Sequence, residues 1–368
     1  MTDGTPCARV LGEGSARIWG MSSAERLGRI FARAGVSQGE SAGSGTVVLA
    51  RADHVFDEAL IKAVIVRPDS VMIGAEGAPV AAHVREANAD VAAEALLAGN
   101  AASAVLRDLT RLDPADLTYN SALRKREAPV LERLDAGNAR AVEARLFQGS
   151  YKGITDLVTK YVWPVPARIV TRWCALTGIS PNQVTFASLI LVLVAMYLFW
   201  IGQFGWGLVA AWVMTFLDTV DGKLARVTLR SSPWGNVFDH GIDLIHPPFW
   251  WWAWLAGVQA SGFDLPHLEL LLAVIVGGYV AQRIEEGIFI RLFGMHMHAW
   301  RRFDSFFRLI TARRNPNLLL LSAATLVGRP DIGLIAVGVW TALCLVVHAV
   351  QIVQGLGARR PLVSWLEG

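Results

Sequence analysis

Four aspartates in the middle of the chain have the spacing of a converging carboxylate cluster. Asp218 and Asp221 are three residues apart and share one face of a helix. Asp239 and Asp243 are four residues apart and also share a face. Two antiparallel helices carrying these pairs would bring all four carboxylates to one point. Unpaired charges are costly in an apolar environment, and divalent cations bound by oxygen ligands would remove that cost, so the spacing predicts a metal site.

The elements that position these aspartates are predicted from two flanking apolar runs, Trp206–Leu217 and Leu244–Val258. Small residues between the aspartates leave room for a bulky ligand to approach the backbone. They are Gly222, Ala225 and Gly235. The alternative is a set of helix-end carboxylates that face water and pair with neighbouring basic side chains. Those side chains are Lys223, Arg226 and Arg230.

Eight fixed positions in the right order favour the cluster over the water-facing alternative, because long spaced motifs are specific. They are Asp218, Asp221, Gly222, Ala225, Arg226, Gly235, Asp239 and Asp243. This stretch resembles the signature of the CDP-alcohol phosphotransferase family, D-x2-D-G-x2-A-R-x8-G-x3-D-x3-D. Every fixed position is matched without a gap or a substitution.

The resemblance implies an integral membrane enzyme of phospholipid synthesis. Such an enzyme transfers a substituted phosphoryl group from a CDP-linked donor, CDP-diacylglycerol or a CDP-polyol, to an alcohol and releases CMP. It implies one or two Mg²⁺ or Mn²⁺ ions held by Asp218, Asp221 and Asp239. Asp243 would take the proton from the attacking alcohol and would also touch a metal. The implied nucleotide-binding residues are Asp218, Gly222, Ala225, Arg226 and Gly235.

Length and composition agree with a membrane protein that has a second domain. The chain of 368 residues has room for two domains, and its hydrophobic content of 53% is high for a soluble protein. The net charge of +3 is small, so bulk charge gives no indication of a nucleic-acid partner. The three cysteines have no metal-ligand spacing and are expected to be buried or lipid-facing. They are Cys7, Cys174 and Cys344.

Residues 1–122 are expected to form a small cytoplasmic α/β domain, because strand and helix patterns alternate and Met1–Gly14 has no apolar core of a secretory signal. The predicted strands are Thr46–Ala50, Val71–Ile73 and Pro79–His83. The predicted helices are Ala24–Ala34, Asp57–Val66, Ala87–Leu97 and Ala101–Leu109.

The stretch Thr46–Phe56 resembles the core strand of sugar-1-phosphate nucleotidyltransferases. Its context resembles the cytidylyltransferase half of bifunctional inositol-phosphate cytidylyltransferase/phosphotransferase proteins. Those proteins carry a Gly-rich loop that presents backbone N–H groups to a triphosphate, followed by a lysine. Here Val10–Ser15 lacks that pattern, and no lysine precedes Lys62. We therefore expect a degenerate, non-catalytic domain in which Asp53 is a strand-end residue.

Residues 123–180 are expected to be a charged connector followed by a helix that lies in the membrane interface. Ser150–Leu176 mixes basic residues with aromatic and aliphatic residues at partial helical spacing. Pro164 and Pro166 are expected to break this segment. An ordinary soluble amphipathic helix is the alternative.

Residues 181–368 contain six apolar segments that are predicted to span a membrane, although a span needs about 20 residues and the fifth segment is shorter. They are Val184–Ile201, Gly205–Val227, Val237–Ala260, Leu268–Phe293, Leu318–Val327 and Ile332–Ile352. Basic residues gather in the loops after the second and fourth segments and in the tail, where they include Arg359 and Arg360. Arg329 is the only one in the opposite loops. This asymmetry predicts cytoplasmic termini and an active site at the cytoplasmic side of the inner membrane.

The acceptor side of the reaction has fewer signals in the sequence. Arg283 lies inside the fourth segment and is a candidate for binding an acceptor phosphate, with an internal ion pair to Glu286 as the alternative. Arg291 belongs to a basic loop that either contacts anionic headgroups or binds a phosphorylated polyol. His296 and His298 are not expected to form a metal site. The Trp250–Trp254 cluster is expected to face lipid or the membrane interface.

The likeness of the first domain favours an inositol-phosphate-type acceptor, with a glycerophosphate-type acceptor as the alternative. Membrane lipids and a second copy of the chain in a homodimer are the other expected partners. A non-enzymatic transporter or scaffold would use the same carboxylates for a different purpose. A transporter is expected to carry an internal repeat or paired broken helices, and the sequence has neither.

Overall fold

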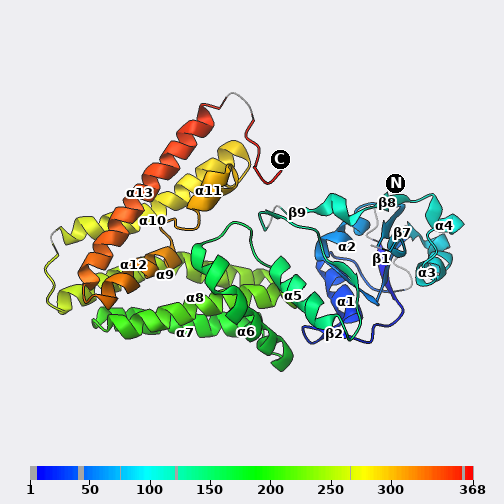
Figure 1. Ribbon diagram of the computed structural model, residues 1–368, viewed down its shortest axis with the longest axis horizontal. Coiled ribbons are helices and arrows are strands. Elements are labelled where there is room, and N and C mark those ends of the chain that lie inside the picture. Colours follow the sequence, from blue (N-terminus) through cyan, green and yellow to red (C-terminus); the bar gives the residue numbers. More distant parts are fainter. Residues whose placement is uncertain are drawn as a thin grey trace.

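The computed structural model combines a small α/β domain with a bundle of long helices (Figure 1). The structure describes residues 6–39, 45–74, 76–120, 123–265, 267–358 and 361–367. The tail arginines of the topology prediction, Arg359 and Arg360, lie outside these ranges. The first domain lies against the C-terminal end of α8 (Phe204–Val227) and against α5 (Ala139–Gly149) (Figure 1).

The first domain is built on a five-stranded mixed sheet of order β1-β4-β7-β6-β8. The strands are β1 (Cys7–Leu11), β4 (Thr46–Arg51), β6 (Ser70–Ile73), β7 (Pro79–Arg85) and β8 (Thr110–Leu112). β1 pairs in parallel with β4, and β4 pairs antiparallel with β7. β4 is buried because Val47, Val48 and Leu49 are packed on both faces of the sheet. The predicted α/β layer domain is confirmed.

The helices of the first domain follow the predicted segments closely, except for the last. They are α1 (Ser23–Arg33), α2 (Glu58–Ile65), α3 (Ala89–Leu97) and α4 (Ala104–Arg107). α1 begins at a capping box, in which the Ser22 hydroxyl accepts from the Glu25 N–H and the Glu25 carboxylate accepts from the Ser22 N–H. α4 is shorter than the helix predicted over Ala101–Leu109.

The connector pairs with the first domain before it reaches the helix bundle. Short two-stranded pairs join β2 (Arg17–Ile18) to β3 (Met21–Ser22), β9 (Tyr119–Asn120) to β10 (Lys125–Arg126), and β5 (His54–Phe56) to β11 (Leu131–Arg133). α5 (Ala139–Gly149) follows. A π-helical turn at Val158–Val162 then leads into α6 (Pro164–Thr177). Pro164 occupies the first helical position, where its missing N–H costs nothing, so the predicted break falls where the helix begins.

Six further helices correspond to the six predicted apolar segments. They are α7 (Pro181–Trp200), α8 (Phe204–Val227), α9 (Pro233–Ala260), α10 (Leu268–Phe293), α12 (Arg314–Leu326) and α13 (Pro330–Leu356), with the short α11 (Arg302–Phe307) before α12. Within the described ranges, α7 and α13 are long and apolar enough to cross a membrane. Membrane crossing by the other four helices stays a prediction.

The tryptophan cluster of α9 was predicted to face lipid or the interface, and this prediction is wrong for three of its members. Trp250, Trp251 and Trp254 are buried in the core of the bundle, whereas Trp252 is 45% exposed. The indole N–H of Trp250 donates to the Val192 carbonyl at 3.0 Å, and that of Trp254 donates to the Pro330 carbonyl at 3.0 Å. α9 packs against α7, α10 and α13, so one of its faces points into the core.

The first domain contacts the connection between α8 and α9 through hydrogen bonds and one buried side chain. Arg26 donates to the Val227 carbonyl at 2.8 Å, and Arg29 donates to the Thr228 carbonyl at 2.6 Å. These cations satisfy carbonyls at the C-terminal end of α8, which is also the negative end of the helix dipole. Leu229 adopts a positive φ of 55° and inserts into the hydrophobic core of the first domain. The two domains are therefore joined at the end of a helix that carries two of the motif aspartates.

Leu229→Ala is expected to loosen this connection. Removing a buried leucine costs about 2 kcal/mol or more, which corresponds to more than about a tenfold rise in opening of the docked segment. The measurement is hydrogen exchange at two backbone N–H groups. The Leu229 N–H donates to the Arg226 carbonyl, and the Arg230 N–H donates to the Ala225 carbonyl. Leu326→Ala is the matched control, because that side chain is exposed. Unchanged exchange at both N–H groups would show that Leu229 does not anchor the connection.

Candidate active site

A polar cavity of about 740 Å³ lies among α8, α9, α10 and the start of α12. Its lining includes every position of the motif, from Asp218 on α8 to Asp243 on α9. Arg33 of the first domain also reaches it, where its guanidinium donates to the Ser231 hydroxyl at 2.5 Å. The cavity is thus formed mainly by the helix bundle and touched by the first domain at one edge.

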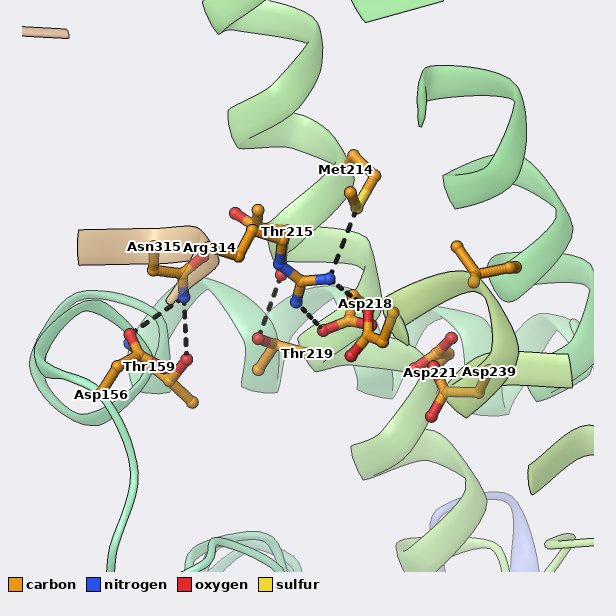
Figure 2. Close-up of polar contacts among 12 residues, drawn as sticks. Asp156, Thr159, Met214, Thr215, Asp218, Thr219, Asp221, Asp239, Arg314 and Asn315 are labelled. Carbon is orange, nitrogen blue, oxygen red and sulfur yellow. Dashed lines mark hydrogen bonds and ion pairs between the residues drawn. The ribbon is translucent and has the colours of Figure 1, made fainter. Parts of the chain in front are cut away.

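Three of the four predicted aspartates form a compact acidic group. Oxygen atoms of Asp218, Asp221 and Asp239 lie within 4.8 Å of one another. α8 contributes the first two, one turn apart, and α9 contributes the third (Figure 2). One carboxylate oxygen of Asp221 accepts from the Thr185 hydroxyl at 2.6 Å.

The chemistry of this acidic group fits a divalent cation. The second carboxylate oxygen of Asp221 is buried and has no hydrogen-bond partner among the described residues. A buried oxygen of this kind carries a desolvation cost that a bound cation would remove. Carboxylate oxygens are also the ligands that Mg²⁺ and Mn²⁺ prefer. Asp218, Asp221 and Asp239 therefore have the donor set that the predicted metal requires.

Asp243 lies outside the acidic group of three and contacts Arg314 instead. One guanidinium nitrogen of Arg314 donates to Asp243. Another donates to Asp218 (Figure 2). The Asp243 side chain is 43% exposed, compared with 19% for Asp218. Arg314 thus links the acidic group to the carboxylate predicted as the base. The structure does not group Asp243 with the other three as a metal ligand.

Arg314 is the main site residue whose location was not predicted from the sequence. It was counted in a basic cytoplasmic loop, but it forms the first turn of α12 and points into the cavity. The neighbouring Asn315 amide donates to Asp156 at 2.9 Å, which fixes the start of α12 against the connector (Figure 2). The feature of the sequence that could have identified Arg314 is its position as a cation directly before an apolar segment.

The predicted nucleotide-binding positions all line the cavity, and the two glycines among them have different surroundings. A Cβ atom at Gly235 would lie 2.6 Å from the Asn182 side-chain oxygen, so a larger residue would collide there. A Cβ at Gly222 would meet only the end of Arg226, at 3.8 Å. The backbone at Gly222 therefore faces open space that a bulky ligand can enter.

The alternative prediction was that the aspartates face water and pair with the basic side chains of the motif. The structure does not show those pairs among the described residues. Lys223 and Arg226 both donate to the Ser150 carbonyl, at 3.3 and 3.1 Å. The Lys223 ammonium also lies 3.5 Å from the centre of the Tyr151 ring, a cation–π contact. Within the acidic group, Asp218 pairs with Arg314 instead, and Asp239 lies 3.8 Å from His240.

Another part of the cavity lining, which we call the basic wall, carries a cluster of cationic side chains. They are Arg124, Lys152, Arg283, Arg308 and Arg313, with His296 beside them. Burial, with Arg226 and Arg124 nearby, lowers the pKa of Lys152 to about 8. Burial, with Arg313 nearby, lowers the pKa of Arg308 to about 9. Cations crowded in this way favour the binding of an anion.

Arg124 reaches this wall from the connector, and its backbone is held in an uncommon conformation. Its φ of 50° lies in the left-handed region, which bulky residues adopt only when the surrounding structure imposes it. Such strained positions occur often at ligand sites. Neither Arg124 nor Lys152 was identified as a site residue from the sequence, because both precede the motif by more than 60 residues.

The two predicted acceptor residues have different positions. Arg283 lines the cavity and also lies 3.5 Å from Glu286, so the internal ion pair offered as the alternative is present. Glu286 also pairs with Arg313 and lies 3.3 Å from His298. Arg291 is exposed in the last turn of α10 and is not part of the cavity lining.

Other predicted positions have ordinary structural roles. In the first domain, Asp53 forms a bidentate ion pair with Arg51 and contacts His54 at 2.7 Å, as expected of a strand-end residue. The three cysteines are buried and free, as predicted. Neither His296 nor His298 belongs to the metal-compatible group found in the described residues.

Comparisons with known proteins point to one family. Residues 178–298 match the model of the CDP-alcohol phosphatidyltransferase family. Archaetidylinositol phosphate synthase of Pyrococcus horikoshii is 31% identical over 116 residues, which are 31% of this chain and 58% of that protein. Phosphatidylinositol phosphate synthase of Streptomyces avermitilis is 31% identical over 93 residues, 24% of this chain and 38% of that protein.

A third relative carries two activities in its name. The bifunctional IPC transferase and DIPP synthase of Rubrobacter xylanophilus is 29% identical over 163 residues, which are 44% of this chain and 34% of that protein. The chain thus spans less than two thirds of the length of each of these three relatives.

Proposed function

We propose that this chain, whose residues 178–298 form a CDP-alcohol phosphatidyltransferase domain, transfers a substituted phosphoryl group from a CDP-linked donor to a phosphorylated polyol and releases CMP. One observation carries the proposal. A single cavity is lined by the acidic group of three aspartates and by a separate cluster of five cationic side chains. The acidic group suits a metal and a nucleotide diphosphate, whereas the basic wall suits the phosphate of an acceptor.

The donor would bind at the acidic group. Asp218, Asp221 and Asp239 would hold one or two Mg²⁺ or Mn²⁺ ions, which when bound would neutralise the donor diphosphate. The nucleotide would approach the backbone where small residues leave the cavity open. Those residues are Gly222, Ala225 and Gly235. Arg226 would leave the Ser150 carbonyl or share its donors in order to contact a donor phosphate.

Asp243 would take the proton from the attacking hydroxyl. Its side chain is the most exposed of those paired with Arg314, so an acceptor can reach it from the cavity. Arg314 would position Asp243 relative to Asp218, because its guanidinium contacts both carboxylates. The reaction would form a bond between the acceptor oxygen and the transferred phosphorus and would break the bond to CMP.

The acceptor would bind through its phosphate at the basic wall. Arg124, Lys152 and Arg308 would contribute charge there, with Arg283 at the inner side. The names of two relatives, archaetidylinositol phosphate synthase and phosphatidylinositol phosphate synthase, support an inositol-phosphate-type acceptor. Arg291 is left out of the proposed acceptor site because it is exposed and does not line the cavity.

The setting that we propose is the inner membrane, crossed by α7, α8, α9, α10, α12 and α13, with the chain as a homodimer. The excess of arginines in the loops that follow α8 and α10 supports cytoplasmic termini and a cytoplasmic cavity. A donor made from CTP would then be available on the side where the cavity opens.

A matched acceptor screen tests the proposal. The full chain is supplied with Mg²⁺ and either CDP-diacylglycerol or a CDP-polyol, and CMP release is measured. Inositol is compared with inositol phosphate, and glycerol with glycerol phosphate. We expect each phosphorylated acceptor to react at least about tenfold faster at equal subsaturating concentration, because each charged hydrogen bond contributes about 1.5–3 kcal/mol. Equal rates within both pairs would contradict the acceptor assignment, and no CMP release with any pair would favour the non-enzymatic alternative.

The KM for the acceptor should depend on pH through Lys152. Its pKa is lowered to about 8, so the ammonium is charged below that pH and loses its proton as the pH rises through it. The acceptor KM should therefore rise by roughly tenfold over that range, through loss of one charged contact. Lys152→Arg keeps its charge throughout and should show no such rise over the range in which Lys152 loses its proton. Superimposed KM profiles of the two proteins would remove Lys152 from the acceptor site.

A further inference from the structure

A second cavity, of about 530 Å³, adjoins the proposed active site at the connector. Three parts of the chain form it: the connector, the region of α11 and the C-terminal turn. Its cationic lining residues are Arg124, Lys125, Arg126, Lys160 and Arg302, and its aromatic ones are Tyr161, Phe306 and Trp365. Arg124 and Thr155 belong to the walls of both cavities.

The charge of this second cavity is unbalanced. Among the described residues, no aspartate or glutamate belongs to its lining. Lys125 pairs with Glu127, whereas in the part of the chain that the structure describes Lys160 and Arg302 have aromatic contacts and no ion pair. The Lys160 ammonium lies 5.5 Å from the centre of the Tyr161 ring, and the Arg302 guanidinium lies 5.6 Å from that of Trp365. A ligand that matches this cavity must carry negative charge.

An exposed apolar surface continues from the rim of the second cavity along α6. Tyr161 and Phe306, both cavity-lining, are 64% and 68% exposed. Val165, Ile169 and Trp173 follow at intervals of four residues on one face of α6 and are each more than half exposed. A helix with such a stripe next to basic residues is suited to a membrane interface. A matching ligand therefore has an apolar part as well as a charged part.

We propose that the second cavity binds the headgroup phosphate of an anionic phospholipid, whose acyl chains cover the exposed stripe of α6. The cations supply the contact to the phosphate, and the aromatic rim lies at the level where headgroup and acyl chain meet. A soluble phosphate ester would use the cations but would leave the stripe uncovered. This site is distinct from the proposed reaction, because the acidic group and Asp243 line only the first cavity.

Photo-crosslinking in bilayers tests the lipid site. The full chain is reconstituted in phosphatidylcholine with a trace of photo-crosslinkable phosphatidylglycerol, and unlabelled phosphatidylglycerol is titrated as competitor. Each juxtamembrane cation contributes about 1 kcal/mol, so Lys160→Gln and Arg302→Gln should each weaken the apparent affinity about fivefold. Arg302→Lys should keep most of the affinity, which separates loss of charge from loss of fold. Arg168→Gln is the matched control, since Arg168 is an exposed cation of α6 that does not line the cavity.

Two results would overturn the proposal. The first is an equal loss of affinity in Arg168→Gln and Arg302→Gln, which would indicate diffuse attraction to a charged bilayer and no specific site. The second is displacement of the labelled lipid by soluble glycerol phosphate at the same concentration as by the lipid, which would identify a soluble anion as the occupant. The crosslinking experiment does not measure transferase activity. Its result is therefore independent of the proposed transferase function.

Discussion

Asp221→Asn is expected to reduce CMP release to the background rate. Asp221 is the most buried of the three grouped aspartates, at 3% exposure, and one of its oxygens has no partner among the described residues. The asparagine keeps the size of the side chain and can still accept from Thr185, but it lacks the negative charge that a divalent ion requires. Loss of a preorganised charge of this kind costs at least about 10²-fold in turnover.

The same substitution should be visible without turnover. Titration of Mn²⁺ into the substrate-free protein should give a weaker affinity for Asp221→Asn than for the natural chain, because one anionic ligand is missing. Asp264→Asn is the control, since Asp264 is exposed in the segment after α9 and does not line the cavity. Near-normal turnover together with unchanged metal affinity in Asp221→Asn would remove Asp221 from the metal site.

Asp243→Asn is expected to lose about 10²- to 10⁴-fold in turnover, the usual contribution of a positioned general base. Affinity for the donor should change little, because Asp243 lies outside the acidic group and contacts Arg314 instead. Asp218→Asn should behave differently, since Asp218 belongs to the group and its loss would disturb the bound diphosphate. The measurement is titration of a CDP-linked donor in the presence of Mg²⁺ for both variants.

The competing role for Asp243 is that of a fourth metal ligand, which the sequence motif also allows. In that case donor affinity would fall as far in Asp243→Asn as in Asp218→Asn, and another group would take the proton. Because Arg314 contacts both carboxylates, Arg314→Lys is a useful third variant. It keeps the charge but loses the forked geometry. If Asp243 is the base, this variant should lower turnover more than donor affinity.

The sequence predicted the helices of the bundle well because their signal is local. Long apolar runs interrupted by Gly and Pro fall close to the observed bounds, and the segment Leu268–Phe293 coincides with α10. The start of α7 has a local signal of the same kind, with Ser180 as the N-cap and Pro181 at the first helical position. The spacing of the aspartates predicted that two helices bring four carboxylates to one point, because residues three or four apart share a helix face, and three of the four form the acidic group.

Features that depend on how distant segments meet could not be read in this way. Arg314 lies 96 residues from Asp218, and no local pattern indicates that its guanidinium joins two motif aspartates. Apolar residues occur both at lipid-facing and at core positions. The composition of this segment therefore led to a wrong prediction for Trp250 and Trp254, which are buried in the core. The insertion of Leu229 into the first domain likewise depends on docking between two domains.

The most direct test of the account follows the phosphorus that is transferred. The full chain is incubated with Mg²⁺, inositol phosphate and a CDP-linked donor labelled at the phosphorus distal to cytidine. The account predicts that CMP and a labelled phosphodiester of the acceptor appear in equal amounts, and that both are lost in Asp221→Asn. CMP release with the label in a free phosphomonoester would contradict it, because that outcome means hydrolysis and not transfer to the acceptor.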